Sequence, residues 1–140
     1  MKKGFTLIEL LVVIAVLGIL ASVVLVAINP SERINEANDS GKKNDVSQIA
    51  TALESYFTNN QGSYTGATST TLVSGGYLKR YPTTSTVVIA TGGASSVAYA
   101  TLQAASATCA TGASATKYWV YRSATGVSQV ECLASTPTAP

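Results

Sequence analysis

Residues 1–30 read MKKGFTLIELLVVIAVLGILASVVLVAINP, and they decide how the rest of the chain is organised. Two lysines and a glycine precede an apolar run over residues 5–28 that carries a single charge, Glu9. As a helix this run reaches about 36 Å, enough to cross a hydrocarbon core of about 30 Å with some tilt. We therefore expect a membrane-spanning helix over residues 5–30. An acid inside such a helix is costly and usually marks a function, so Glu9 is a candidate functional residue.

The segment GFTLIE at residues 4–9 resembles the processing motif of type IV pilins and pseudopilins, and the chain is most similar to a major type IV pilin. The resemblance is specific over the first 30 residues and weaker as far as Pro82. It implies a leader peptide at residues 1–4, cleavage between Gly4 and Phe5 by a prepilin peptidase, and N-methylation of Phe5. It also assigns Glu9 to assembly, as the partner of the amine on a neighbouring subunit.

The same resemblance implies a structural subunit with no cofactor, which polymerises through its N-terminal helix into an extracellular filament for adhesion, motility or DNA uptake. The implied partners are further copies of the chain, the peptidase, the assembly platform protein with its ATPase, and the membrane before assembly. Lys2 and Lys3 would stay in the cytoplasm under the positive-inside rule, which places the later domain outside. A type II secretion pseudopilin and a membrane-anchored binding domain that never polymerises are the alternatives.

An ordinary secretory signal also begins with basic residues and an apolar run, and small residues stand at Ala21 and Ser22. The run is long for such a signal, and the charge of Glu9 would weaken it. We therefore favour the membrane anchor. For Glu9 itself, the alternative is a structural acid that reaches toward the membrane interface.

Gly18 and Pro30 are the predicted weak points of the helix. In the pilin family a glycine and a proline here bracket a stretch that can lose helical order in the filament. Gly18 stands where that glycine is expected, whereas Pro30 comes later than the usual proline. Residues 29–31 could equally break the helix outright, with Ser31 capping the next one.

Residues 31–60 predict an amphipathic helix that continues into the globular domain. Ile34 and Ala37 begin its apolar stripe. The polar residues 38–45 follow, and they either face solvent or form a local break in the helix. The residues of the stripe recur at three- and four-residue spacing: Val46, Ile49, Ala50, Leu53, Tyr56 and Phe57. The sequence at residues 59–62 predicts the end of the helix.

Residues 61–134 predict a loop and a small antiparallel β-sheet, so the fold class is α+β, with the long helix packed on the sheet as in pilins. Strands are expected at residues 86–90, 97–105, 117–122 and 127–132, the last two joined as a hairpin. Four loop residues should fold back onto the helix stripe: Tyr64, Leu72, Tyr77 and Leu78. Residues 135–140 predict a mobile tail.

The chain has two cysteines and no histidine. If the domain lies outside the cell, Cys109 and Cys132 are most simply a disulfide, worth about 3 kcal/mol on the chain-entropy model. Neither a catalytic triad nor a zinc site is predicted from this composition, so we expect no enzyme and no metal site. Glu131 is the single acid after residue 54, which argues against the calcium site of major pseudopilins.

Charged residues make up 11% of the chain, and two of the nine basic residues lie in the leader, so the rest is balanced. This pattern gives no support to a general nucleic-acid binder. The segment KYWVYR at residues 117–122 mixes bases and aromatics in the manner of single-strand binders. Ordinary cross-strand packing explains the same residues, and we favour it over nucleic-acid binding.

Overall fold

The structure is a computed structural model that describes residues 4–82, 87–107, 109 and 115–139. Over residues 87–92 it describes the backbone alone. The chain forms two compact units, one up to Ile34 and one from Asn35 onward. Each unit is described by itself. Lys2 and Lys3 lie outside the described residues.

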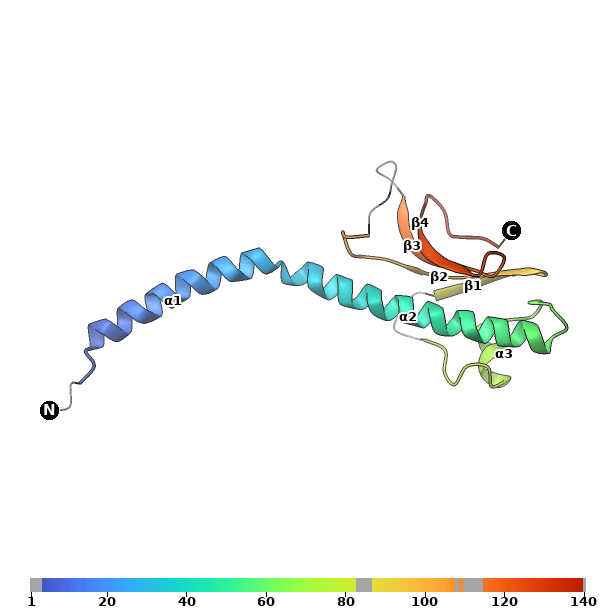
Figure 1. Cartoon of the computed structure of the whole chain (residues 1–140), viewed down its shortest axis with the longest axis horizontal. Coiled ribbons are helices and arrows are strands. Elements are labelled where there is room, and N and C mark those ends of the chain that lie inside the picture. The colour runs from blue at the N-terminus through green and yellow to red at the C-terminus, as the bar shows by residue number, and fades with distance from the viewer. Residues whose placement is uncertain (1–3, 83–86, 108, 110–114, 140) are drawn as a thin grey trace. The chain divides into compact units, whose positions relative to one another are not determined.

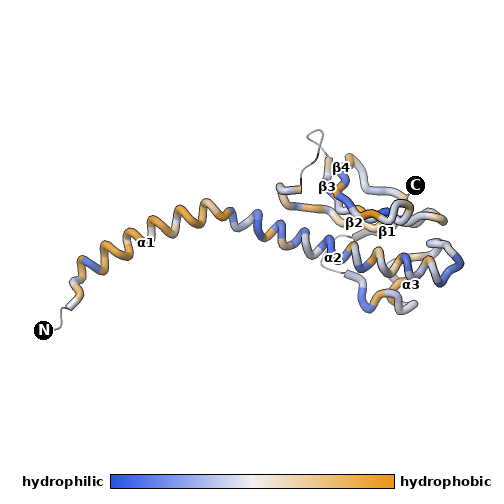
Figure 2. The backbone as a smooth tube through the Cα atoms, viewed as in Figure 1, coloured by the Kyte–Doolittle hydropathy of each residue, from blue (hydrophilic) through white to orange (hydrophobic). Residues whose placement is uncertain are grey.

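The first unit is dominated by α1, Leu7–Ile28, which contains no buried residue. Figure 2 shows the apolar colour running along nearly all of this helix. Among the described residues, one stretch of helix, the apolar one near the N-terminus, is long and apolar enough to cross a membrane. A helix that is apolar all round and buries nothing within its own chain must be covered by lipid or by other chains.

The end of α1 lies at Asn29, whose backbone is left-handed with φ of 46°. Pro30 then opens α2, Pro30–Asn59, at a position where a missing N–H costs nothing. The carbonyl of Asn29 accepts bonds from the N–H groups of Glu32 and Arg33. Ser31 therefore does not cap the new helix, which was one of the two alternatives for residues 29–31. It lies inside α2, and its hydroxyl donates to Asn29 Oδ1.

In the second unit, the apolar stripe of α2 forms the core against the sheet. Five of the six predicted stripe residues are buried: Val46, Ile49, Ala50, Leu53 and Tyr56. The sixth, Phe57, is half-buried and packs against them. Ala52 is also buried. The predicted beginning of the stripe is wrong for the single chain, because Ile34 and Ala37 are exposed. The helix continues without a break through residues 38–45.

The loop after α2 turns back onto the helix. Its first turn uses left-handed residues at Gln61 and Gly62. As predicted, Tyr64, Leu72 and Leu78 are buried and Tyr77 packs against the same core. The loop also contains a short helix that we did not predict, α3, Ser69–Ser74, which is capped by the side chain of Thr68.

The sheet has four antiparallel strands in the order β1-β2-β3-β4, so each strand pairs with its neighbours in sequence. Their bounds are Val87–Gly92, Ser95–Thr101, Thr116–Arg122 and Val127–Leu133. The predicted start of the first strand at Thr86 lies outside the described residues. The second strand ends four residues before the predicted Ala105. The α+β fold class is confirmed, with α2 lying along one side of the sheet (Figure 1).

Alternation along β2 and β3 places two separate clusters on the two faces of the sheet. Ala98, Ala100 and Tyr121 join the core formed with α2. The other face carries a second buried cluster, Val97, Tyr99, Tyr118 and Val120, with Leu133 and Ala139 packed against it. We call this the outer cluster.

The outer cluster explains why the end of the chain differs from the expected mobile tail. Pro137 is buried, Ala139 packs on the outer cluster, and Arg122 Nη1 donates to the carbonyl of Thr138 at 3.0 Å. The described part of the tail, residues 135–139, therefore lies against the sheet. Pro140 lies outside the described residues.

The core makes a direct prediction for Leu53, whose side chain is fully buried. Leu53→Ala should lower the free energy of unfolding by about 2–5 kcal/mol, since it removes buried methyl groups and leaves a cavity. Val73 is 37% exposed on α3, and Val73→Ala should change stability by less than about 0.5 kcal/mol. Urea unfolding of the full chain in detergent, followed by Trp119 fluorescence, measures both. Equal losses would contradict the assigned core.

Candidate assembly site

Glu9 and Thr6 form a closed hydrogen-bonded pair at the start of α1. Thr6 is the N-cap, and its hydroxyl accepts from the Glu9 N–H at 3.3 Å. The Glu9 carboxylate reaches back and accepts from the N–H and the hydroxyl of Thr6 at 2.9 and 2.7 Å. This reciprocal capping box satisfies backbone N–H groups that a helix start otherwise leaves unpaired.

The carboxylate of Glu9 lies beside an apolar hollow of about 420 Å³ lined by Phe5, Ile8, Val12 and Val13. Both bonds that Glu9 accepts from Thr6 go to one oxygen, Oε2. A carboxylate offers about four acceptor positions. Glu9 can therefore keep its capping bonds and still accept from a further donor in apolar surroundings.

Gly4 and Phe5, the predicted cleavage residues, precede α1 in extended, exposed chain. A side chain added at Gly4 would meet nothing within 4 Å. Packing within the chain therefore gives no reason for glycine here. Cleavage between Gly4 and Phe5 stays a prediction.

Gly18 and Pro30, the predicted break residues, occupy different local structures. α1 runs through Gly18 as regular helix, and a side chain added there would also meet nothing within 4 Å. The helix boundary lies at Asn29 and Pro30. Whether the helix between these two residues loses order in an assembly stays a prediction.

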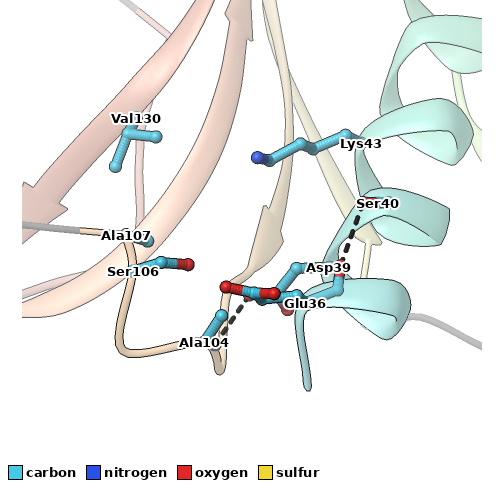
Figure 3. Close-up of a pocket in the computed structure, with 8 residues that line it drawn as sticks. All are labelled: Glu36, Asp39, Ser40, Lys43, Ala104, Ser106, Ala107 and Val130. Carbon is cyan, nitrogen blue, oxygen red and sulfur yellow. Dashed lines mark hydrogen bonds between the residues drawn. The ribbon is translucent and has the colours of Figure 1, made fainter. Parts of the chain in front are cut away.

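Asp39 is a structural residue that the sequence reasoning missed. It lies in the polar stretch expected to face solvent or break the helix, yet it is 3% exposed. Its carboxylate accepts from the Gln103 N–H at 2.9 Å. It also accepts from the Ala104 N–H at 2.8 Å (Figure 3). The chain leaves the sheet after Leu102, whose N–H still donates to the Lys117 carbonyl, and the next two N–H groups bond to Asp39 instead. The available signal was spacing, because Asp39 precedes Val46 by seven residues and so lies on the buried stripe of α2.

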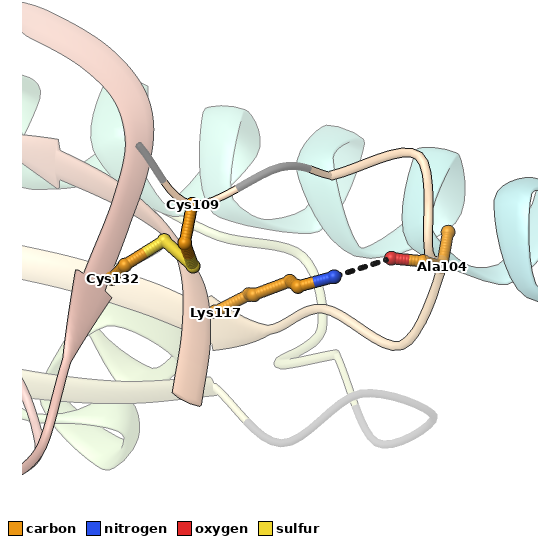
Figure 4. Close-up of a disulfide and its surroundings, with 4 residues drawn as sticks. All are labelled: Ala104, Cys109, Lys117 and Cys132. Atoms are coloured by element: carbon orange, nitrogen blue, oxygen red, sulfur yellow. Dashed lines mark hydrogen bonds between the residues drawn. A yellow bond between two sulfur atoms is a disulfide. The ribbon is translucent and has the colours of Figure 1, made fainter. Parts of the chain in front are cut away.

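Two lysines strengthen this junction. Lys42 Nζ donates to the Thr101 carbonyl at 2.8 Å and lies 3.5 Å from Asp39 Oδ1. Lys117 Nζ donates to the Ala104 carbonyl at 3.3 Å. Figure 4 shows this bond beside the Cys109–Cys132 disulfide, which confirms the predicted pairing with Cα atoms 5.7 Å apart. Helix, strand end and disulfide loop are thus tied together at one end of the domain.

Glu54 is a second internal anchor. Its Oε1 accepts from the hydroxyls of Tyr64 and Tyr121 at 2.8 and 2.6 Å, which links α2 to the loop and to β3. Burial, followed by the bond to Glu54, raises the pKa of Tyr64 and of Tyr121 above the ordinary phenol value. Both hydroxyls are thus held as neutral donors to the carboxylate.

The basic and aromatic residues at 117–122 are used within the domain. Lys43 Nζ lies 5.1 Å from the centroid of the Trp119 ring. Lys117 Nζ donates to the backbone carbonyl of Ala104. Arg122 forms a two-pronged pair with Glu131, both bonds 2.7 Å long. This bonding lowers the pKa of the Glu131 carboxyl. These contacts account for the pattern without a nucleic-acid strand.

Comparison with known proteins gives one match. The family model described as the prokaryotic N-terminal methylation motif matches residues 1–25. The match supports a precursor like those of type IV pilins and pseudopilins, and thus a structural class of protein. No curated protein and no solved structure matches the chain significantly.

The Asp39 junction predicts a stability loss on a nearly isosteric change. Asp39→Asn should lower the free energy of unfolding by about 1–3 kcal/mol. Even with the amide oxygen in place of Oδ2, the amide NH₂ replaces Oδ1 and faces two donors, the Gln103 N–H and the Lys42 ammonium. Asn44→Ala changes an exposed side chain of the same helix and should cost less than about 0.5 kcal/mol. Urea unfolding compares them. Similar values for the two variants would refute the junction.

The two tyrosines on Glu54 predict a pH dependence at the alkaline end. Because their pKa values are raised in the folded state, their contribution to stability is full below about pH 10 and is lost as the pH rises above it. Tyr121→Phe removes one of these groups. The stability difference between the parent chain and Tyr121→Phe should therefore be constant from pH 7 to 8.5 and shrink by pH 11. A difference that stays constant to pH 11 would contradict the assignment.

Proposed function

We propose that the chain is the structural subunit of a type IV pilus, made as a membrane-anchored precursor and polymerised through α1 into an extracellular filament. One observation carries the proposal. The methylation motif over residues 1–25 leads directly into a helix that buries none of its own residues, within a chain that also holds a folded α+β domain.

The proposed assembly begins with cleavage between Gly4 and Phe5 by a prepilin peptidase, which removes Lys2 and Lys3 and methylates Phe5. The new amine on Phe5 is a cation in apolar surroundings. Glu9 of a neighbouring copy pairs with it, and each charge then compensates the other in a low dielectric. Oε1 of Glu9, which makes no bond to Thr6, is the oxygen that accepts this partner.

Once the charges register two copies, packing of the α1 helices replaces their contact with lipid and supplies the main cohesion. In the proposed topology the N-terminus lies in the cytoplasm and the sheet domain outside the membrane, where an oxidising environment suits the disulfide. The platform protein and its ATPase extract the precursor. Loss of helical order between Gly18 and Pro30 during assembly belongs to the same proposal.

The ion pair that Glu131 forms with Arg122 favours a pilus over a type II secretion pseudopilus. Glu131 is the only acid after residue 54, and Arg122 holds both of its oxygens. The sheet domain therefore offers no free carboxylate for the calcium site of major pseudopilins.

Two substitutions at Glu9 separate charge pairing from helix capping. Glu9→Val removes both functions, whereas Glu9→Gln keeps the capping box, which glutamine also forms, and loses the charge. Breaking one partner of a buried pair costs about 3–5 kcal/mol, so both variants should lower the filament yield by roughly 100-fold or more. The measurement is the amount of this chain in filaments sheared from cells. Mass spectrometry of membrane fractions should show that cleavage and methylation still occur.

If Glu9→Gln assembles normally, capping alone explains Glu9 and the pairing role fails. If the parent chain itself never appears in sheared filaments, the alternative of a membrane-anchored domain that does not polymerise replaces the proposal.

A further inference from the structure

The outer cluster is covered by the end of the chain itself. Val97, Tyr99, Tyr118 and Val120 are at most 7% exposed although they face away from α2. Ala139 packs directly on them. The C-terminus lies on the side of the sheet opposite α2 (Figure 1). The short tail that follows β4 therefore covers the face of the sheet that α2 leaves uncovered.

The tail lies as an extended peptide with alternating faces. Pro137 is buried and Ala139 half-buried, whereas Thr136 and Thr138 are exposed. This is the period of two expected of an extended segment on a surface. The residues that face the sheet are proline and alanine, and the hydroxyls point away from it. The contact thus selects an extended, proline-containing segment with small apolar residues.

The sheet contributes an aromatic pair and a fixed donor to this contact. The rings of Tyr99 and Tyr118 meet edge to face with centroids 5.5 Å apart. Arg122 is oriented by its two bonds to Glu131, and its remaining Nη1 donates to the Thr138 carbonyl. Aromatic surfaces combined with a donor to a peptide carbonyl are the usual means of recognising proline-containing extended segments.

We propose that the outer face of the sheet is a peptide-binding site for an extended segment of the type Ser-Thr-Pro-Thr-Ala. In the single chain residues 135–139 occupy it as an intramolecular strap. The partner that fits the site when the strap leaves is the same segment of a second copy, because every copy presents an identical tail. The site is independent of α1 and Glu9, and its failure would leave the proposed function unchanged.

The test uses the full chain in detergent and a variant truncated after Leu133, which keeps the disulfide and all four strands. The probe is a fluorescent peptide of residues 134–140, followed by anisotropy. The truncated chain should bind it saturably and at least about tenfold more tightly than the full chain, in which the attached tail competes at an effective concentration in the millimolar range.

Two altered peptides test the recognition without any risk to folding. The peptide with Pro137→Gly should lose binding, because it removes the buried ring. The peptide with Thr138→Ala should bind like the parent, since only the carbonyl of Thr138 contacts Arg122 and its side chain is exposed.

Ala139→Asp in the full chain provides a second route if truncation prevents folding. It places a charge against the outer cluster and should raise peptide binding toward the truncated value. Absence of binding to the truncated chain and to Ala139→Asp overturns the site. Equal binding to full and truncated chains, or to all three peptides, shows non-specific association and overturns it as well.

Discussion

The second unit depends on the contact between the apolar stripe of α2 and the inner face of the sheet. Ala98 and Ala100 present little side chain on that face, so the helix can approach the strands closely enough to bury Ile49 and Leu53 completely. Close-packed interiors tolerate few voids, and the small strand residues therefore match the large helix residues. Two further segments cover apolar surface that this contact does not bury. The loop after α2 packs on the flank of the helix, and the tail packs on the outer face of the sheet.

Two carboxylates on α2, Asp39 and Glu54, are paired with donors from other parts of the domain, and these pairs fix its geometry. Asp39 accepts from the N–H groups of Gln103 and Ala104 shortly after β2, and Glu54 joins α2 to the loop and to β3. A buried carboxylate that lost these donors would carry the full penalty of desolvation. The ties therefore act against alternative registers as well as holding the native one. The disulfide reinforces the end of the domain where Asp39 lies.

The sequence predicted the elements whose cause is local and missed those whose cause is tertiary. The bounds of α2 within one residue, the hairpin at residues 123–126 and most of the stripe from Val46 to Tyr56 follow from periodicity and turn residues. The helix predicted at residues 5–30 is two residues shorter at each end. Asp39 looked solvent-facing because its partners lie more than 60 positions later, and the tail looked mobile because Ser, Thr and Pro predict no packing. For the candidate site, the motif located Glu9, and the structure added its capping bonds with Thr6.

The capping bonds of Glu9 are compatible with its proposed role in assembly, because the two would use different oxygens and different stages. Before assembly the carboxylate is bonded to its own helix start, which reduces the penalty of holding a charge in an apolar segment. In the proposed assembly an incoming amine would add a third donor, at Oε1, without displacing the two donors of Thr6, so pairing would not require the helix to fray. The residues of α1 are all left unburied within the chain. Lipid or other chains must therefore cover them. The folding of the sheet domain and the association of α1 are therefore separate energetic problems, solved by separate residues.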